Sequence, residues 1–544
     1  MGVVANQATD HPWLVAILAG AATHVTVFIR GEWHMQAPWL ATISVGTFAA
    51  ALITDLTRSH SGTVSLVSIV TAFYIGLFTS IVIYRLFCHK LHRFPGPFGA
   101  KISKLWHTLN CLDSRQHVYL HTLHKKYGSI VRTGPRELMI VTPDIFELLD
   151  DPRNQSHKTD WYDLLRPAKA VISERDPAVH NKRRKIWDKA LNAASLAEYK
   201  PLLSNHVQKL LDNIDETVAE GNPVLANDIF YWFAFDVVSE LALGKTFGMQ
   251  EERKWHQSTL HLRSGMALLG IASSVPWLAR VAFAYVPNFP VIRDWFALQD
   301  FLKKKMTERV HRGLVDKDIA EHFIESVGEE NEWTEEDWQW VHGDGMNVLI
   351  AGSETTAATI TFLFSQLAKN RALANRLHRS LESTEPTDLE ALRENELLNG
   401  IINETLRLYP ALPSAAYRET LEDGLKVGDT WIPGGTKIIA PRYSVARLEA
   451  AFADAESFIP ERWMDKPELV SWPKAFAPFA TGRYSCVGRQ LALNEIRMTT
   501  ASIVQKYVVS LASEEDGEAV ISEMKDQMAV FPGPLRLIFS RRQD

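Results

Sequence analysis

The 22 residues from 63 to 84 contain no charged side chain. A helix of that length extends about 33 Å at roughly 1.5 Å per residue, which matches the ~30 Å hydrocarbon core of a bilayer. A segment of this kind is stable in lipid, whereas the more polar sequence after it requires water. The chain is therefore expected to divide into a membrane part and a larger soluble part.

Two further apolar stretches, residues 13–29 and 38–54, precede this one and contain Thr, Ser and Gly. Each can cross the bilayer, form a hairpin or lie at the interface. Basic residues such as Arg85, Lys90 and Arg93 follow the third stretch, whereas no Lys or Arg precedes the first. The positive-inside rule then places the C-terminal body in the cytosol and the N-terminus across the membrane. Three crossings fit that parity, and so does one. We predict an anchor region at residues 1–93.

Residues 94–104 begin Phe-Pro-Gly-Pro-Phe-Gly, a pattern that does not continue a helix. It is read either as a linker or as a stiff hinge that sets the angle of the body to the membrane. The chain has 544 residues and a net charge of −6, which gives no indication of nucleic-acid binding. Its three cysteines form no Cys-x-x-Cys pair, so a disulfide scaffold or a zinc site is poorly supported. Such thiols suit a reducing compartment.

Helical patterns dominate the soluble body, residues 105–544. Short strands are expected near residues 130–141, 424–439 and 520–539, where Gly and Pro punctuate apolar runs. The predicted fold class is therefore mostly α with minor β-sheets (α+β). An apolar run at residues 266–286 is read either as core or as a surface that dips into the membrane.

One predicted helix begins after Thr334, where a hydroxyl precedes three acidic residues, and continues to about Asn370. Its apolar middle, residues 346–367, should be buried. That middle nevertheless contains Ala-Gly-Ser-Glu354-Thr355-Thr. One interpretation is close helix packing at Gly352, with Glu354 paired elsewhere. The other is a groove where a ligand meets the helix and a proton passes.

Cys486 lies in a loop with Phe479, Gly482 and Gly488, just before a helical run. A lone cysteine is usually a core residue or a reactive thiol. A helix start offers backbone N–H groups that stabilise a thiolate, and the two glycines allow a flat cofactor to approach the backbone. Phe479 can shield the sulfur from water. The third interpretation is therefore a permanent thiolate ligand to iron.

Glu404 and Arg407 are three residues apart and share a helix face. Surface pairs of this kind are common and contribute little. Downstream, Phe-Ile-Pro-Glu-Arg462-Trp adds an arginine fixed by a Pro-containing turn. That arginine can complete a carboxylate–guanidinium network.

These four segments occur in the order Ala-Gly-x-Glu-Thr-Thr, Glu-x-x-Arg, Phe-x-Pro-Glu-Arg-Trp and Phe-x-x-Gly-x-x-x-Cys-x-Gly. In that order they resemble the cytochrome P450 family of haem-thiolate monooxygenases. The resemblance covers about residue 94 to the C-terminus, and the anchor is similar to that of microsomal, fungal-type members that act in secondary metabolism. It implies the cytochrome P450 fold, haem b as the cofactor and Cys486 as the axial ligand of its iron.

The resemblance also implies roles for other residues. Thr355 and Glu354 would form the proton-delivery pair beside bound O2, and Glu404, Arg407 and Arg462 would lock the core behind the haem. The residues expected near the haem propionates are His180, Arg184 and Arg418. The basic stretch 182–185 has a second reading, as a solvated surface or the docking face for an acidic reductase. Tyr484 stands where many relatives have Arg, and a phenol carries no charge to pair with a propionate.

The function so implied is a monooxygenase that inserts one oxygen atom from O2 into a lipophilic small molecule, as a tailoring step in secondary-metabolite biosynthesis. Electrons from NADPH would come from NADPH–cytochrome P450 reductase, with cytochrome b5 as a further donor. The location would be the endoplasmic reticulum membrane, with the catalytic domain in the cytosol. The alternatives are a haem-thiolate isomerase or dehydratase, and a non-catalytic haem-binding membrane protein. Consumption of NADPH beside a reductase separates the first reading from these two.

Overall fold

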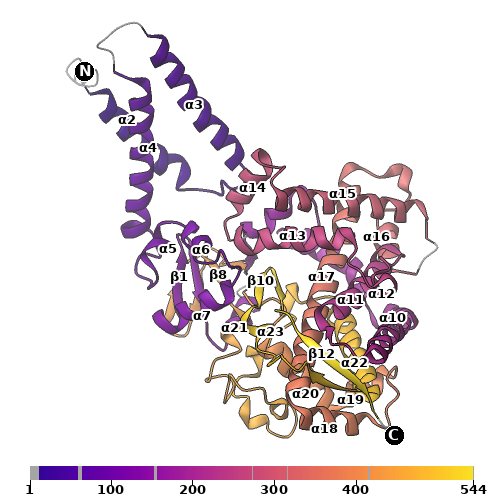
Figure 1. Ribbon diagram of the computed structural model, residues 1–544. Helices are drawn as coiled ribbons and strands as arrows, with labels where there is room; N and C mark the ends of the chain where they lie inside the picture. Colours follow the sequence, from indigo (N-terminus) through magenta and orange to yellow (C-terminus); the bar gives the residue numbers. More distant parts are fainter. Residues whose placement is uncertain are drawn as a thin grey trace.

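The computed structural model describes residues 11–58, 64–151, 156–272, 274–314, 317–414 and 417–542. A mostly helical body carries small sheets, and a group of N-terminal helices projects from one side of it (Figure 1). The α+β class expected from the sequence is confirmed. The first residue of the apolar stretch 63–84 lies outside the described residues.

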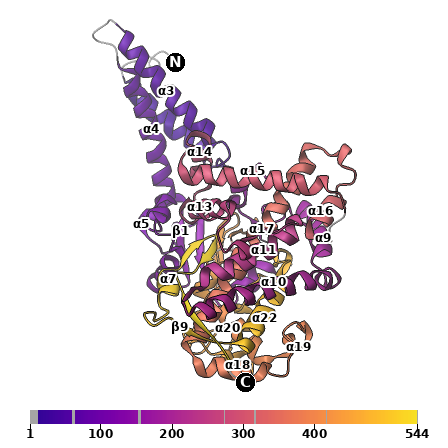
Figure 2. The same cartoon turned by 45° about the vertical axis from the view of Figure 1, so that its right-hand side comes forward.

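The projecting group consists of α2 (Pro12–Thr23), which continues as η1 (His24–Phe28), then α3 (Ala37–Thr57) and α4 (Leu66–Ile83), which continues as η2 (Tyr84–Cys88). Figures 1 and 2 both show this group extending away from the body, while the end of α4 leads into the body. Helix α3 and the stretch Leu66–Cys88 are long and apolar enough to cross a membrane, and Pro12–Phe28 is a shorter apolar helix.

Helices α2 and α4 cross at two glycines. A Cβ atom on Gly20 would lie 2.0 Å from the Phe73 carbonyl oxygen, and one on Gly76 would lie 2.0 Å from the Ile17 carbonyl oxygen. Small residues at such a crossing let two backbones approach closely, which is how helices associate in lipid. The His24 ring also hydrogen-bonds the Ser80 hydroxyl across this contact (2.9 Å). The first apolar helix is therefore packed on the third along its length.

Segment 94–104 is packed on the body. The Arg132 backbone N–H donates to the Pro95 carbonyl oxygen (2.6 Å), and the Arg132 side chain donates to the Arg85 carbonyl oxygen (2.9 Å). Gly96 has φ +155°, and a Cβ there would lie 2.3 Å from the Arg132 carbonyl oxygen. A short helix, α5 (Phe98–Ile102), forms within the segment because the Pro and Gly residues all lie at or before its first turn.

Helix α17 (Glu335–Lys369) runs through the body (Figure 1). Its N-terminus is the expected one: the Thr334 hydroxyl and the Asp337 carboxylate cap each other's backbone N–H groups. Its length and composition would also suit a membrane span, but 83% of its apolar window is buried in the body, so it is a core helix. The other body helices are α6 (Leu105–Leu109), α7 (Gln116–Tyr127), α8 (Ile145–Asp150), α9 (Pro177–Ala190), α10 (Ala193–Glu220), α11 (Ala226–Leu243), α12 (Met249–Glu252), α13 (Gln257–Ala272), α14 (Pro276–Tyr285), α15 (Pro290–His311), α16 (Ile319–Glu325), α18 (Arg371–Leu381), α19 (Leu389–Glu394), α20 (Glu396–Leu408), α21 (Arg442–Val445), α22 (Arg489–Lys506) and α23 (Ala519–Ser522).

The strands form at the three expected places and at a few more. One sheet has the order β1-β2-β8-β5-β3, with only β2 and β8 parallel. A second has the order β4-β12-β9, and two hairpins pair β6 with β7 and β10 with β11. The strands are β1 (Ile130–Gly134), β2 (Glu137–Ile140), β3 (His157–Lys158), β4 (Val224–Leu225), β5 (Tyr417–Glu419), β6 (Leu425–Val427), β7 (Thr430–Ile432), β8 (Lys437–Ile439), β9 (Tyr507–Leu511), β10 (Lys525–Gln527), β11 (Ala529–Phe531) and β12 (Arg536–Arg541).

The core has two parts. The larger surrounds α11, α17 and α22, and the smaller lies against the five-stranded sheet. Residues from both cores flank the loop that precedes α22. That loop is therefore held between the two parts of the core.

Candidate active site

Cys486 occupies the loop between the short turn η8 (Gly482–Tyr484) and α22. Its backbone N–H donates to the Phe479 carbonyl oxygen (2.7 Å), which closes the loop. Its side chain is exposed, whereas most of α22 beyond is buried. The backbone therefore fixes the cysteine while its sulfur stays accessible.

The charges around the sulfur oppose the effect of burial. Dense surroundings raise the pKa of the Cys486 thiol, and the Gly488 backbone N–H and the Arg184 and Arg442 guanidinium groups act to lower it. A group that is both accessible and densely surrounded lines a recess rather than a flat surface. Such a thiol stays protonated at neutral pH until a cation binds it, since a metal ion drives deprotonation of a coordinating thiol.

The two loop glycines have different roles. Gly482 has φ +63°, and a Cβ there would lie 2.9 Å from the Asp150 Cβ, so backbone conformation and contact with α8 require it. These two observations explain why residue 482 is glycine without the expected close approach of a flat cofactor. At Gly488, the nearest atom to an added Cβ would be the Cys486 Sγ, 3.9 Å away. This second glycine leaves the space beside the sulfur open.

Tyr484 is surrounded by basic side chains. The Arg418 guanidinium lies 4.6 Å from its ring centre, the Lys158 Nζ lies 4.8 Å from it, and the His180 ring packs edge-on at 4.9 Å. Burial, followed by the charge of Lys158, lowers the pKa of His180 to about 4, so this imidazole is neutral. The phenol ring thus lies within cation–π distance of two basic side chains.

Lys158 and Arg418 are opposite one another on the antiparallel strands β3 and β5, and both are buried. Directly opposed like charges destabilise a sheet. Lys158 donates to the carbonyl oxygens of Val171 and Ile172, and Arg418 donates to the Tyr162 hydroxyl and the Tyr417 carbonyl oxygen. Among the described residues, neither forms an ion pair with a carboxylate, and the Arg418 Nε has no hydrogen-bond partner. Burial, followed by the charge of Arg418, lowers the pKa of Lys158 well below its usual value, so a bound anion would stabilise the charged form of this side chain. The pair is therefore suited to an anionic ligand.

Arg184 is directed to the cysteine loop. Its guanidinium donates to the Ser485 carbonyl oxygen (2.6 Å) and to the Asp188 carboxylate (2.7 Å). Its neighbour Arg183 is buried and pairs with Asp344 on α17. The structure therefore brings Arg184 next to the residue before Cys486, where it supports the loop and adds positive charge near the sulfur.

In the middle of α17, Gly352 and Glu354 meet α11 and α13. A Cβ on Gly352 would lie 2.9 Å from a methyl group of Val238, so close packing explains this glycine. Glu354 is fully buried, and neither of its carboxyl oxygens has a hydrogen-bond partner in the described residues. Burial raises the pKa of Glu354 to about 7, although the Arg263 charge and the Tyr231 hydroxyl act to lower it.

Thr355 lies on another face of the same helix. It is half-buried, and its hydroxyl donates to the carbonyl oxygen of Ala351 (2.7 Å), an exposed residue within the otherwise buried stretch. Consecutive helical residues point about 100° apart. The carboxyl of Glu354 and the hydroxyl of Thr355 therefore share a helix turn but face different surroundings.

Glu404, Arg407 and Arg462 form one fully buried network, separate from the cation cluster. The Glu404 carboxylate accepts two bonds from Arg407 (2.8 and 2.9 Å), one from Arg462 (3.0 Å), one from the Ile459 N–H (2.8 Å) and one from the Trp463 indole (2.9 Å). Arg407 also donates to three carbonyl oxygens. The surface-pair reading of this motif is excluded by its burial.

The model of the cytochrome P450 family matches residues 95–539. The chain belongs to the cytochrome P450 family. It is 36% identical over 487 residues to a cytochrome P450 monooxygenase of Eupenicillium brefeldianum, orf5, a match that covers 89% of this chain and 98% of the relative. It is 31% identical over 540 residues to tryprostatin B 6-hydroxylase of Aspergillus fumigatus, covering 96% and 95% of the two chains.

A solved structure supports the fold of this cytochrome P450. The haem domain of cytochrome P450DA superposes with a TM-score of 0.66 at 18% identity, over 79% of this chain and 94% of that one. The family gives the P450 a haem-thiolate centre, a redox partner and a lipophilic substrate, and the apolar N-terminal helices suit membrane anchoring.

Sequence reasoning missed three parts of this cytochrome P450 site. Lys158 carries no motif, and its importance depends on pairing with a distant strand. Tyr231 lies on α11 and Arg263 on α13, and both influence the pKa of Glu354 on α17. No local sequence pattern encodes these contacts. The only available signal was indirect, namely that a buried Glu requires neighbours that tolerate its charge.

Proposed function

We propose that this cytochrome P450 is a haem b monooxygenase that inserts one atom of O2 into a lipophilic small molecule, in a tailoring step of secondary-metabolite biosynthesis. The observation that carries the proposal is the pairing of an accessible, loop-fixed Cys486 with two buried basic side chains, Lys158 and Arg418, which form no carboxylate ion pair within the described part of the chain. The names of the relatives support the same class: one is a monooxygenase and another a 6-hydroxylase of tryprostatin B.

The residues present fit haem b. Its two carboxylates would complement Lys158 and Arg418, with the neutral His180 as a further hydrogen-bonding group. Cys486 would hold the iron, beside the open space left by Gly488, with Phe479 next to it. A thiolate-ligated haem supplies the activation of O2 and the cleavage of its O–O bond.

The protein's own residues would control protons and water. The Glu354 carboxyl, with a pKa of about 7, can both bind and release a proton at neutral pH. The Thr355 hydroxyl, which already bonds within its helix, is placed to orient a polar group beside Ala351. Arg184 would hold the Ser485 carbonyl oxygen and so keep the Cys486 sulfur in place. The apolar surroundings of α17 exclude bulk water.

The proposed electron source is NADPH, through NADPH–cytochrome P450 reductase, with cytochrome b5 as a second donor. The proposed location is the endoplasmic reticulum membrane, with residues 1–93 as anchor, residues 94–104 as the connecting segment and residues 105–544 as the cytosolic catalytic domain. Product analysis with candidate lipophilic substrates and a reductase tests the whole proposal. Consumption of NADPH without any oxygenated product from a broad substrate set would oppose it.

Thr355→Ala is expected to lower the product formed per NADPH by about tenfold and to divert the electrons to hydrogen peroxide, because a proton-orienting hydroxyl is lost. Thr359→Ala is the matched control, since its hydroxyl makes the same bond one turn along, to the Thr355 carbonyl oxygen (2.8 Å). Product, peroxide and NADPH are measured together, beside the melting temperature. If Thr355→Ala formed as much product per NADPH as the wild type and Thr359→Ala do, Thr355 would serve packing alone.

The pH dependence of coupling should report on Glu354. An acid that donates a proton must be protonated, so the product formed per NADPH should fall as the pH rises through about 7. Glu354→Gln should lower coupling and remove this dependence. Glu495→Gln is the control, because Glu495 is equally buried, with its pKa raised to about 8 by burial, but lies on α22. A wild-type pH profile in Glu354→Gln would remove Glu354 from the proton path.

A further inference from the structure

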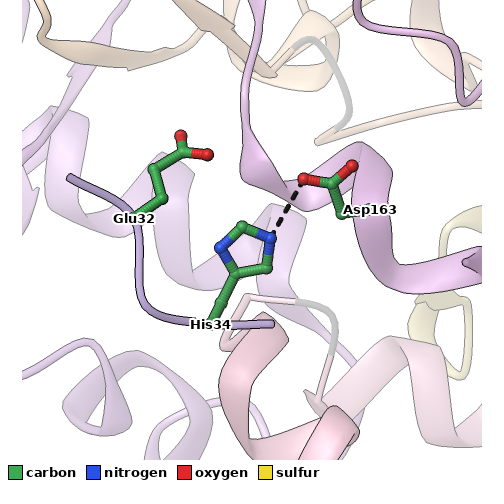
Figure 3. Close-up of side chains that lie close together, drawn as sticks. All are labelled: Glu32, His34 and Asp163. Atoms are coloured by element: carbon green, nitrogen blue, oxygen red, sulfur yellow. Dashed lines mark hydrogen bonds and ion pairs between the residues drawn. The ribbon is translucent and has the colours of Figure 1, made fainter. Parts of the chain in front are cut away.

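The loop between the first two apolar helices, residues 29–36, contacts the catalytic body. Glu32 and Arg175 form a two-pronged ion pair, with Nη1–Oε2 at 2.8 Å and Nη2–Oε1 at 2.9 Å. His34 is buried and hydrogen-bonds the Asp163 carboxylate (3.0 Å), as the dashed line in Figure 3 shows. The Gly31 carbonyl oxygen accepts a bond from Arg136 (3.2 Å). A membrane-anchor loop thus makes specific polar contacts with the body.

Glu32, His34 and Asp163 are close enough to suggest a metal site, but the contacts indicate otherwise. The Arg175 guanidinium already binds both Glu32 oxygens and also donates to Asp163 (2.6 Å). Asp163 takes a further bond from Arg166 (2.9 Å). The carboxylate oxygens that would bind a metal ion therefore already accept hydrogen bonds from arginine side chains. The cluster is a charge network that joins two parts of the chain.

A second contact lies beside the first. The Tyr285 hydroxyl at the end of α14 donates to the Pro38 carbonyl oxygen (2.8 Å) and also hydrogen-bonds Thr42, both at the start of α3. Figures 1 and 2 both show the body end of α3 next to α14. The loop and the helix start therefore dock on the same side of the body that α4 enters.

Arg175 extends this contact towards the cation cluster. Its Nε donates to the backbone carbonyl oxygen of Lys158 (3.2 Å) in strand β3. The Lys158 side chain, in turn, lies over Tyr484, two residues from Cys486. The path from Glu32 to the cysteine loop consists of one ion pair, one hydrogen bond and one cation–π contact.

We propose that residues 29–36 are a docking loop that fixes the catalytic domain to the membrane segment, and that Glu32 is a positioning residue which, through Arg175 and strand β3, holds Lys158 and Tyr484 in place. The docking part is independent of the reaction catalysed. The positioning part rests on the proposed haem site. Docking also requires loop 29–36 to lie on the same side of the membrane as the body. That arrangement follows if α2, α3 and α4 each cross the membrane.

The test uses the full-length protein in microsomal membranes. Trypsin cuts after Arg30, an exposed residue of the docking loop, and the rate is followed by the mass of the N-terminal fragment that ends at Arg30. Glu32→Gln and Arg175→Gln should each raise this cleavage rate by about tenfold, because the bidentate ion pair between the two side chains is lost. Glu198→Gln, at an exposed ion pair with Lys317 within the body, should leave the rate unchanged. Wild-type cleavage rates in both Glu32→Gln and Arg175→Gln would overturn the docking proposal.

The transfer of haem to an acceptor protein and the absorption spectrum test the positioning part. Glu32→Gln should speed haem transfer by about tenfold and shift the spectrum, although residue 32 does not touch the cation cluster. An unchanged melting temperature in this variant excludes a general loss of fold. Faster cleavage with unchanged haem transfer would overturn the positioning role and leave docking. If the wild-type chain incorporates no haem, the proposed function fails, while the cleavage rates still decide on docking.

Discussion

Cys486→His is expected to abolish the strongly red-shifted band that the ferrous protein gives with carbon monoxide, because that band requires a thiolate ligand. Imidazole also binds haem iron but donates less electron density. The variant should therefore retain haem while losing the band and all monooxygenation. The measurements are the ferrous carbon monoxide spectrum, the haem content per chain and product formation. Retention of the band would assign the ligand to another residue.

The chain contains its own control for this experiment. Cys111 is 1% exposed, and burial raises the pKa of its thiol to about 12. Its replacement by alanine leaves Cys486 and its loop intact. Cys111→Ala should keep the full band, with at most a modest drop in melting temperature from the small cavity. Loss of the band in this variant would indicate that the spectrum reports on general folding rather than on one sulfur.

The features predicted well from sequence are those written within one short segment. The cap at Thr334, the glycine-framed cysteine loop and the strand pair around residues 130–141 each depend on neighbours a few positions away. Their physical causes, namely capping, turn geometry and alternation of apolar residues, act locally. The structure accordingly places these elements where the patterns predict them.

The features that sequence did not predict depend on contacts between distant segments. Lys158 belongs to a two-residue strand and acquires its role only opposite Arg418. The role of Arg184 at a propionate stays a prediction, and the bond of its guanidinium to the Ser485 carbonyl oxygen depends on packing of α9 against the cysteine loop. Tyr484 carries no charge to pair with a propionate, and the structure places its ring against two basic side chains, Lys158 and Arg418. Such roles follow from tertiary geometry, which no local pattern encodes.

Two buried glutamates, Glu404 and Glu354, differ in the number of hydrogen bonds that their side chains accept. Glu404 and Glu354 are both fully buried. The carboxylate of Glu404 accepts five hydrogen bonds, while that of Glu354 accepts none in the described residues. A fully bonded carboxylate stabilises a structure, and an unbonded one is retained at a cost to stability. The first therefore belongs to the architecture, and the second is the candidate for chemistry.

Glu404→Leu is expected to destabilise the protein by roughly 3–5 kcal/mol, the range observed when one partner of a buried ion pair is removed. The change would leave two buried guanidinium groups, on Arg407 and Arg462, without their carboxylate, together with the Ile459 N–H and the Trp463 indole. Because this network joins α20 to the turn η5 (Pro460–Trp463), its loss should loosen the segment that leads to the cysteine loop. We expect most of the variant to be recovered without haem and to melt well below the wild type.

Glu461→Gln provides the comparison for that prediction, because Glu461 pairs with the half-exposed Arg376 (2.7 Å) only one residue from Arg462. Exposed pairs contribute about 0–1 kcal/mol, so this variant should melt close to the wild type and retain its haem. Glu404→Gln should fall between the two, since an amide oxygen still accepts hydrogen bonds but cannot balance two positive charges. Haem content and thermal unfolding of the three variants are compared under one condition. If Glu404→Leu matched Glu461→Gln in both measurements, the buried network would not be what holds the core together, and the two guanidinium groups would have to find other partners.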